Sequence, residues 1–447
     1  MGPETTIAAL STPPGVSGLA VVRLSGPACA EAARACLGRA DWKPRVLHAA
    51  AFVDPRSGET LDQLAFHMLP APHSPTGEDV LEIFPHGNPI VVESILRALL
   101  ALPEVRPAEP GEFTRRAFEN GRLDLVQAEG LGALVHARSR AAARNALRLL
   151  QGEFSGRLRA LRDRLLDLSA RLELDADFAE EEADPDYASW APRVAEARAA
   201  VEALLRGFER GRDWNRAPRA VVFGPPNAGK SSLVNALTGR ERLLVSEVAG
   251  TTRDFVDVPL RVGGEGGAMA QLVDTAGLGL PVDALDEKAM ERTRAQIAEA
   301  DLRICVADGS MGDEALPKAL AAQAEEADLR VLTHADRPDF VPRPGWISLS
   351  SVTGAGVEEV LAELERRFDP ARGADEEAVA VTERQRDSLA RARDRLLAAE
   401  AHLRNKPAVE ILAFEVREAC LALRELLGEV TADDVLHRLF SGFCIGK

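Results

Sequence analysis

The feature that most constrains the fold of this chain is the stretch GPPNAGKSS, residues 224–232. It follows an apolar run at 219–223 and precedes a helix-like run, so it fits the pattern G-x-x-x-x-G-K-[ST] in the strand–loop–helix context of a phosphate-binding loop. In such a loop, backbone N–H groups surround the β-phosphate of a nucleotide. We expect Lys230 to bridge the β- and γ-phosphates and Ser231 to bind Mg²⁺. Strand-like and helix-like segments alternate to about residue 370, which predicts a parallel sheet with crossover helices.

Two further motifs follow the order expected of a GTPase. The run AQLVDTAGL (270–278) predicts a strand that ends at Asp274, which would hold the magnesium shell, before Gly277, whose N–H would meet the γ-phosphate. In AGTTRD (249–254), Thr252 would complete the coordination of the metal. Together the motifs predict a GTPase-type domain, and a phosphate loop without hydrolysis is the alternative.

The residue after Gly277 bears on how GTP would be hydrolysed. Many small GTPases place a water-orienting glutamine there, whereas this chain has Leu278, which cannot orient water. Hydrolysis would then use another group, and the nearby candidates are Asp283, Asp286 and Glu287. The alternative for each of these carboxylates is an ordinary place in the first turn of a helix.

The element that would recognise the base reads Thr333-His334-Ala335-Asp336, where GTPases usually have Asn-Lys-x-Asp. The Asp336 carboxylate can accept hydrogen bonds from two donors of guanine that adenine lacks. Loss of the asparagine and lysine contacts would cost about 1–3 kcal/mol of binding free energy. We therefore expect weaker binding with guanine preference retained, and an ATPase is the less favoured alternative. The residues expected near the base from the later run SLSSVTGAG are Ser350, Ser351 and Val352.

Length and charge limit the number of domains and the classes of protein to which the chain can belong. The chain has 447 residues, enough for about two to four domains. Its formal charge is −16, so nucleic-acid binding would need a local basic patch. The Arg-rich residues 122–148 are either such a face or a run of ordinary solvated helix arginines. The sequence has no basic leader and no stretch of about 18 apolar residues, which predicts a cytoplasmic protein that does not span a membrane.

Five cysteines without a C-x-x-C pair disfavour both a disulfide framework and a zinc site. Four of them, Cys29, Cys36, Cys305 and Cys420, are expected to be small core residues. The fifth, Cys444, belongs to the apolar ending SGFCIGK (441–447), whose composition indicates a segment that docks. Thr431 and Asp434 resemble a capping box and predict a last short helix that ends near Phe440. Gly442 would then adopt left-handed geometry after this helix.

The composition and hydrophobic periodicity of the sequence predict four segments. Residues 1–118 indicate an α/β domain, 119–215 are helical, 216–375 carry the nucleotide motifs, and 376–447 are helical again. Two rows of residues spaced by seven predict one long helix with an apolar seam; they are Leu147, Phe154, Leu161 and Leu168, and Leu158, Leu165 and Leu172. We infer that the nucleotide domain is inserted into one helical domain.

Five blocks of sequence together resemble one family over essentially the full chain. They are TIAALSTPPGVSGLAVVRLSG, PGEFTRRAFENGRLDLVQAEG, GPPNAGKSSLVNAL, the pair AGTTRD and DTAGL, and the terminal FCIGK. The phosphate loop alone is widespread, whereas its combination with the second block and the tail is specific. On these blocks the chain resembles the tRNA modification GTPases of the MnmE family, also called TrmE.

The resemblance implies an α/β and all-α multidomain chain. It would have an α/β N-terminal folate-binding and dimerising domain, a discontinuous helical domain, and an inserted Ras-like P-loop G domain. The implied function is a GTP-hydrolysing homodimer that adds a (carboxymethyl)aminomethyl group at C5 of the wobble uridine of tRNA. It would use 5-formyltetrahydrofolate or a related folate and would form a heterotetramer or larger complex with the FAD-dependent MnmG. The alternative is a regulatory GTPase that binds RNA or ribosomal partners without one-carbon chemistry.

The resemblance also assigns roles to single positions. Folate would be bound by Arg23, Glu82, Arg122 and Lys447. Potassium, required for dimerisation of the G domains, would be bound by Asn227, Ser246, Val248 and Thr251. The implied catalytic residues are Lys230, the water-polarising Glu287 and Cys444, for which inert filler is the alternative. The nucleotide-binding set is Asn227, Ala228, Gly229, Lys230, Ser231, Ser232, Ser246, Thr251, Thr252, Asp274, Thr275, Ala276, Gly277, Thr333, His334, Asp336, Ser350 and Ser351, with Mg²⁺ on Ser231 and Thr252.

Overall fold

The structure is a computed structural model that describes residues 5–38, 42–137, 140–177, 186–211, 218–242, 256–262, 268–274, 297–298, 300–311, 324–368, 382–405 and 408–446. The chain divides into two compact units, each with its own six-stranded sheet. The first unit contains residues 1–132, 147–205 and 383–447, and the second contains 133–146 and 206–382. Across those described ranges, no helix has the length and apolar character needed to cross a membrane.

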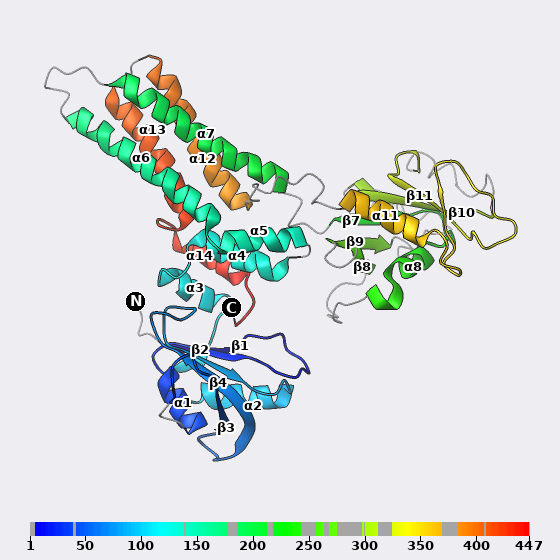
Figure 1. The fold of residues 1–447 in the computed structure, drawn as a ribbon, viewed down its shortest axis with the longest axis horizontal. Helices are drawn as coiled ribbons and strands as arrows, with labels where there is room; N and C mark the ends of the chain where they lie inside the picture. Colours follow the sequence, from blue (N-terminus) through cyan, green and yellow to red (C-terminus); the bar gives the residue numbers. More distant parts are fainter. Residues whose placement is uncertain are drawn as a thin grey trace, which may run out of the picture. The chain divides into compact units, whose positions relative to one another are not determined.

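The sheet of the first unit has the strand order β3-β4-β5-β2-β1-β6 and carries α1 and α2 on one face (Figure 1). All of its pairings are antiparallel except that of β1 with β6. Alternate residues such as Leu24, Phe66 and Ile83 are buried against the two helices, so the residues between them point to the opposite face. The elements are β1 (Thr6–Leu10), β2 (Val22–Ser25), α1 (Cys29–Leu37), β3 (His48–Val53), β4 (Thr60–Leu69), β5 (Val80–Phe84), α2 (Pro89–Leu100) and β6 (Val105–Pro107).

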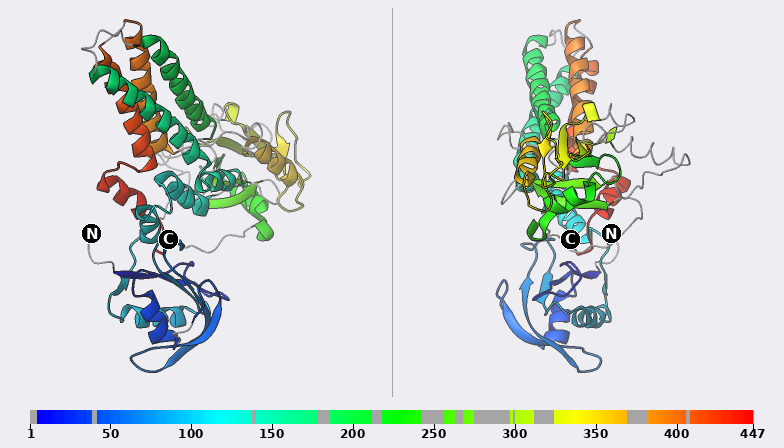
Figure 2. Two further views of the ribbon diagram at one scale, coloured as in Figure 1. Left: turned by 60° about the vertical axis from the view of Figure 1, so that its left-hand side comes forward. Right: turned by 90° about the vertical axis from the view of Figure 1, so that its right-hand side faces the viewer.

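Most of the helices belong to the first unit, and the long helices of this unit lie side by side (Figures 1 and 2). The helix α13 packs against both α6 and α12, and the Arg198 side chain of α7 bonds to Glu400 of α12 at 2.7 Å. The apolar seam of α6 is buried from Phe154 to Leu172. The helices are α3 (Glu112–Glu119), α4 (Leu125–His136), α5 (Arg140–Leu150), α6 (Glu153–Asp177), α7 (Tyr187–Gly211), α12 (Glu383–Leu403), α13 (Val409–Leu427) and α14 (Asp433–Ser441). Most of α5 and the carboxyl ends of α4 and α7 belong to the second unit.

Three local predictions about these helices are wrong. The expected single helix is broken between α5 and α6, where Gly152 has a φ of +83°, and Leu147 is 42% exposed and lies outside the seam. The last helix forms as α14, but Ala432 is its N-cap, no side chain caps it, and the buried Thr431 hydroxyl has no partner among the described residues. Gly442 has a φ of −79°, so the helix ends in right-handed geometry.

The second sheet has the order β12-β11-β10-β7-β9-β8, with all pairings parallel except β8 with β9. Both faces of β7 are buried: Ala220 and Val222 pack towards α8 and α11, and Val221 and Phe223 face the other way. This two-sided burial is typical of a parallel sheet and explains the continuous apolar run. The elements are β7 (Arg219–Phe223), α8 (Lys230–Arg242), β8 (Val256–Val262), β9 (Ala268–Asp274), β10 (Leu302–Asp308), β11 (Leu329–Thr333), β12 (Ile347–Ser348) and α11 (Val357–Phe368).

Candidate functional site

The predicted phosphate loop connects β7 to α8 and packs closely on its neighbouring strands. A Cβ added to Gly224 would lie 2.0 Å from the carbonyl oxygen of Val306 on β10. Gly229 has a φ of +82°, and an added Cβ would lie 3.2 Å from the side chain of Thr333 on β11. A side chain at either position would open the turn, so the two glycines of the motif determine the path of the loop.

Lys230 is the first residue of α8 and is 6% exposed. Its Nζ donates hydrogen bonds to the backbone carbonyls of Gly224 at 3.0 Å and Pro225 at 2.8 Å. A buried ammonium requires such partners, and here they hold the positive charge inside the loop. Asn227, with a φ of +62°, and Ser231 are exposed. The loop therefore fits a phosphate group in both charge and shape.

The predicted magnesium-shell residue Asp274 is the last residue of β9, and the sheet register places its backbone opposite Val222 on β7. The carboxyl ends of these parallel strands therefore meet beside the phosphate loop. Seven other predicted positions and the proposed catalytic glutamate lie outside the described residues; they are Ser246, Val248, Thr251, Thr252, Thr275, Ala276, Gly277 and Glu287.

Thr333 links the phosphate loop to the segment predicted to bind the base. It is 3% exposed, and its hydroxyl lies 2.8 Å from the carbonyl oxygen of Ala228 and 3.2 Å from that of Ala307. The hydroxyl has one proton and so donates to one of these oxygens at a time. A threonine therefore supplies a contact between loop and strand where the usual motif has an asparagine.

Asp336 is exposed, and its Oδ1 accepts a 2.6 Å hydrogen bond from the Ser350 hydroxyl. This bond is the main reason why the pKa of Asp336 lies below its ordinary value, so the carboxylate is an acceptor at neutral pH. The Ser350 oxygen in turn accepts from the backbone N–H groups of Val352 and Thr353. Ser351 is exposed beside them. The structure thus brings the two predicted base-binding segments together.

A second constellation lies on the sheet of the first unit, on the face opposite α1 and α2. The register aligns His67 of β4, Glu82 of β5 and Arg23 of β2 in one row across three strands. Glu82 Oε1 accepts from Arg23 Nε at 2.8 Å, and Oε2 lies 2.7 Å from His67 Nε2. All three side chains are less than one quarter exposed. Of the predicted folate residues, Arg23 and Glu82 are therefore in direct contact.

The other two predicted folate residues are not joined to this row. Arg122 is exposed and packs against Gly77, and the described residues show no hydrogen bond or ion pair from it to Arg23 or Glu82. Lys447 lies outside the described residues. Its neighbour Gly446 is buried, and the Gly446 carbonyl accepts from the Ser11 hydroxyl at 3.0 Å and makes a long 3.5 Å contact with Arg23 Nη1.

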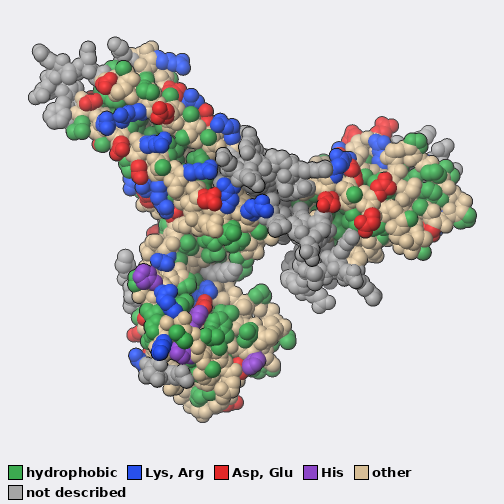
Figure 3. Space-filling model, in the orientation of Figure 1, with side chains coloured by type: hydrophobic (Ala, Val, Ile, Leu, Met, Phe, Trp, Pro, Cys, Tyr) green, Lys and Arg blue, Asp and Glu red, His purple; other side chains and the backbone are tan. Residues whose placement is uncertain are grey.

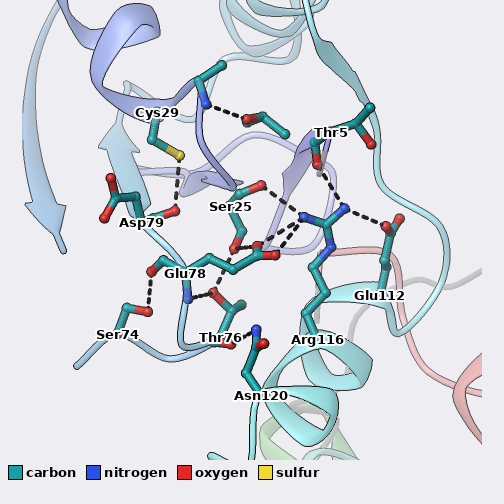
Figure 4. Close-up of polar contacts among 12 residues, drawn as sticks. Thr5, Ser25, Cys29, Ser74, Thr76, Glu78, Asp79, Glu112, Arg116 and Asn120 are labelled. Carbon is teal, nitrogen blue, oxygen red and sulfur yellow. Dashed lines mark hydrogen bonds and ion pairs between the residues drawn. The ribbon is translucent and has the colours of Figure 1, made fainter. Parts of the chain in front are cut away.

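Buried polar contacts hold α3 against β1 and β2 (Figure 4). Arg116 donates to the Glu78 carboxylate at 3.0 Å, to Glu112 at 3.0 Å and to the backbone carbonyl of Thr5 at 2.9 Å. The Ser25 hydroxyl donates to Glu78 at 2.6 Å. Gly111, which directly precedes α3, lies against Phe440 of α14. By fixing α3, this network therefore also positions the surface on which the C-terminal tail packs.

The five cysteines fall into two groups. Burial raises the pKa of the Cys29, Cys36 and Cys305 thiols to about 12, and burial also raises that of Cys420. Cys444 is the exposed one. The prediction that four cysteines are core residues is confirmed, and the tail thiol differs from them in exposure.

Sequence reasoning missed two residues of these sites. His67 stands between the buried Phe66 and Met68, so strand alternation was the available signal for the face on which it lies, but the register is needed to show that it faces Glu82. Asp308 ends β10, and its Oδ2 lies 3.0 Å from His334 Nδ1. A polar residue at the end of an apolar strand was the available signal for Asp308.

Comparison with known proteins covers nearly the whole chain. Residues 6–122 match the family described as GTP-binding protein TrmE N-terminus, and residues 125–444 match the MnmE helical domain. The chain is 41% identical to the tRNA modification GTPase MnmE of Parvibaculum lavamentivorans, with 99% of this chain and 100% of the relative covered. It is 40% identical to that of Thermus thermophilus, with both chains fully covered. The protein described here therefore belongs to the MnmE family.

Proposed function

We propose that this chain is a GTP-hydrolysing enzyme of tRNA modification. The observation that carries the proposal is its identity of 40–41% to relatives named tRNA modification GTPase MnmE, over at least 98% of each of their lengths. The phosphate loop with its buried Lys230 and the ionised Asp336 supports GTP as the nucleotide.

The nucleotide site would use the phosphate loop, the Thr333–Asp336 segment and the Ser350–Ser351 turn. Ser231 and Thr252 would hold Mg²⁺, and Asn227, Ser246, Val248 and Thr251 would hold K⁺. Bound cations would neutralise charge that develops on the phosphates during hydrolysis. Glu287 would polarise the attacking water, because Leu278 has no group that can orient it.

The row of Arg23, Glu82 and His67 is the proposed folate site. The Glu82 carboxylate has about four acceptor positions and uses three of them for Arg23 and His67, so it can accept one more donor from a pterin edge. Arg122 and Lys447 would bind the folate carboxylates. The exposed Cys444 belongs to the tail that contacts Arg23 through Gly446, and we infer for it a role in the modification chemistry.

The same free face supports a homodimer. It contains a shallow apolar depression of about 450 Å³, lined by Leu19, Leu47, Ala49, Gln63, Leu64, Ala65, Phe84 and His86. The space-filling view also shows hydrophobic and histidine side chains side by side on the surface of this part of the chain (Figure 3). An exposed apolar area of this kind is typical of an interface between proteins. tRNA and the FAD-dependent MnmG would be the further partners, and the cytoplasm the compartment.

The proposal is tested by nucleoside mass spectrometry of tRNA from cells that lack this protein. We expect unmodified wobble uridine, restored by the natural chain and not by the Lys230→Ala variant, which lacks the ammonium of the phosphate loop. Normal modification in the deletion strain would contradict the proposal. If the purified chain still hydrolysed GTP in that case, a regulatory GTPase would be the remaining function.

A further inference from the structure

The side chain of His334 is held by a carboxylate from the neighbouring strand. Asp308 and Thr333 are paired across β10 and β11, and His334 follows directly, so its Nδ1 lies 3.0 Å from Asp308 Oδ2. The Asp308 side chain is 11% exposed and that of His334 is 26% exposed. This pair therefore lies at the edge of the base-binding segment, partly shielded from water.

The contact determines which ring nitrogen of His334 carries the proton in the neutral form. Burial alone would raise the pKa of Asp308, but hydrogen bonds from the hydroxyl and backbone N–H of Ser310, and then from His334, outweigh it and keep the pKa below its ordinary value. An ionised carboxylate only accepts hydrogen bonds, so the proton of a neutral His334 ring lies on Nδ1. The other ring nitrogen, Nε2, has no hydrogen-bond partner within the described part of the chain.

Charged groups of both signs surround the His334 ring. Among the described residues, the charged groups around His334 are Asp308 on β10, and Asp336 and Arg337 on its own loop. Arg337 Nη1 lies 3.7 Å from Asp308 Oδ2 and also contacts Ser310. On the side of the phosphate loop, the Lys230 ammonium is bonded to backbone carbonyls. The charged side chains nearest the ring are therefore two carboxylates and one guanidinium.

The backbone places His334 between two residues of the proposed nucleotide site. His334 has a φ of +62°, which turns the chain sharply between Thr333, bonded to the phosphate loop, and Asp336. A histidine is among the residues that tolerate this left-handed conformation. Its position is the one that lysine occupies in the usual motif, where the charge is permanent at physiological pH. Here the charge is conditional, because imidazole gains and loses its proton between about pH 5 and pH 8.

We propose that His334 is a nucleotide-binding residue whose protonation strengthens guanine-nucleotide binding, so that this chain binds its nucleotide more tightly at mildly acidic pH. The inference rests on the proposed nucleotide site. A cation at this position attracts both the face of the base and the negative phosphates, and a neutral ring attracts neither to the same extent. We expect the contribution of His334 to affinity to change about three- to tenfold between about pH 6 and pH 8.

The test is the affinity of the full-length chain for Mg²⁺·GDP, measured across that pH range by fluorescence with a labelled GDP. The His334→Lys variant keeps a charge throughout, and His334→Asn is neutral throughout and tolerates the left-handed backbone. Titration of the GDP phosphates affects every variant alike, so it cancels in the ratio of affinities. The natural chain should match His334→Lys most closely at low pH and approach His334→Asn at high pH.

Asp308→Asn provides the matched test of the partner. Removing the carboxylate destabilises the imidazolium, so the pH at which affinity changes should fall in this variant. Parallel curves for the natural chain and both His334 variants would overturn the inference, even if all of them bind GDP. Absence of GDP binding by the natural chain would instead overturn the proposed nucleotide site itself.

Discussion

Thr333 illustrates how a substituted motif residue retains part of its function. The usual asparagine is absent, yet the Thr333 hydroxyl reaches the Ala228 carbonyl of the phosphate loop at 2.8 Å. The expected weakening of nucleotide binding assumed that this contact was lost. The geometry therefore leaves the lysine position, now His334, as the main source of the predicted loss of binding free energy.

We predict that Thr333→Val, which removes the hydroxyl and keeps the shape, weakens GDP binding about five- to thirtyfold, because a buried acceptor of the loop loses its donor at a cost of about 1–2 kcal/mol. The measurement is GDP affinity, with circular dichroism as a check on folding. Thr238→Val is the matched control: among the described residues, its hydroxyl bonds within α8, to the Val234 and Asn235 carbonyls, so affinity should not change. Equal affinities for the natural chain and Thr333→Val would show that the bond between Thr333 and the Ala228 carbonyl does not contribute to nucleotide binding.

His67 is predicted to position Glu82 for the proposed folate. Replacing it by leucine leaves Glu82 Oε2 without its described donor, and we expect affinity for 5-formyltetrahydrofolate to fall about tenfold, equivalent to about 1.4 kcal/mol. Isothermal titration calorimetry measures the change. His67→Gln should recover part of it, because an amide can also donate to Oε2. The exposed His73, changed to Gln, is the control, and an unaltered affinity in His67→Leu would refute the positioning role.

At the scale of elements, motifs made of adjacent residues were predictable from the sequence, whereas the pairing of β-strands was not. The strand at 219–223 and the loop after it were predicted correctly because a strand, a glycine-rich turn and a helix are adjacent in sequence. The row from His67 to Arg23 depends on the register of three strands. Alternation shows on which face a residue lies, but it does not show that Glu82 pairs with Arg23, 59 positions away, and with His67, 15 positions away. Arg23 and Glu82 were found by resemblance to a family, and His67 was not found.

The broken helix shows how a repeat can mislead. The spacing of seven continues across Gly152, but this glycine adopts a left-handed φ of +83°, and α5 ends just before it, at Leu150. An added Cβ at Gly152 would lie 3.2 Å from the Gln127 side chain, which itself donates to the Leu150 carbonyl. A tertiary contact thus caps α5 at its carboxyl end, and the tendency of the flanking residues to continue the helix is overridden.

The contacts of α3 make a pH-dependent prediction. Burial alone would raise the pKa of Glu112, but hydrogen bonds from Arg106, the backbone of Glu109 and Arg116 outweigh it and hold the pKa below 4.5. A carboxylate with a lowered pKa stabilises the fold above its unfolded value, and this stabilisation is lost as the pH falls through the folded pKa. Glu112→Gln should therefore destabilise α3 by about 3 kcal/mol near neutral pH, and the difference should shrink below about pH 4.5.

Hydrogen exchange of the amides in α3 and β1 measures this local stability, because unfolding of a chain with several units need not be two-state. The control is Glu119→Gln on the same helix: its ion pair with Arg115 is exposed, so we expect a change of at most about 0.5 kcal/mol. A difference between Glu112→Gln and the natural chain that did not depend on pH would contradict the assigned role of the carboxylate.

At the scale of the molecule, the two ends of the described chain meet within the first unit. The Ser11 hydroxyl and the Gly446 carbonyl are separated by 435 positions in the sequence and bond at 3.0 Å. Phe440 and Phe443 pack with Phe118 and Leu125, so α14 brings the tail to α3 and then to β1. Docking of the tail was predicted from its composition, but its partner strand became evident only from the fold.

This arrangement predicts that one methyl group can release the tail. Gly446 has a φ of +92°, and a Cβ there would lie 2.2 Å from the Leu10 carbonyl oxygen, so Gly446→Ala should displace residues 443–446 from β1. Gly442→Ala in the same tail is the control, because Gly442 has an ordinary φ and its nearest neighbour would lie 3.5 Å away. We expect faster hydrogen exchange of the tail and about tenfold weaker folate binding for Gly446→Ala alone. GDP affinity should not change, because the nucleotide loop belongs to the second unit. If both variants bound folate like the natural chain, the contact between Gly446 and Arg23 would have no part in the site.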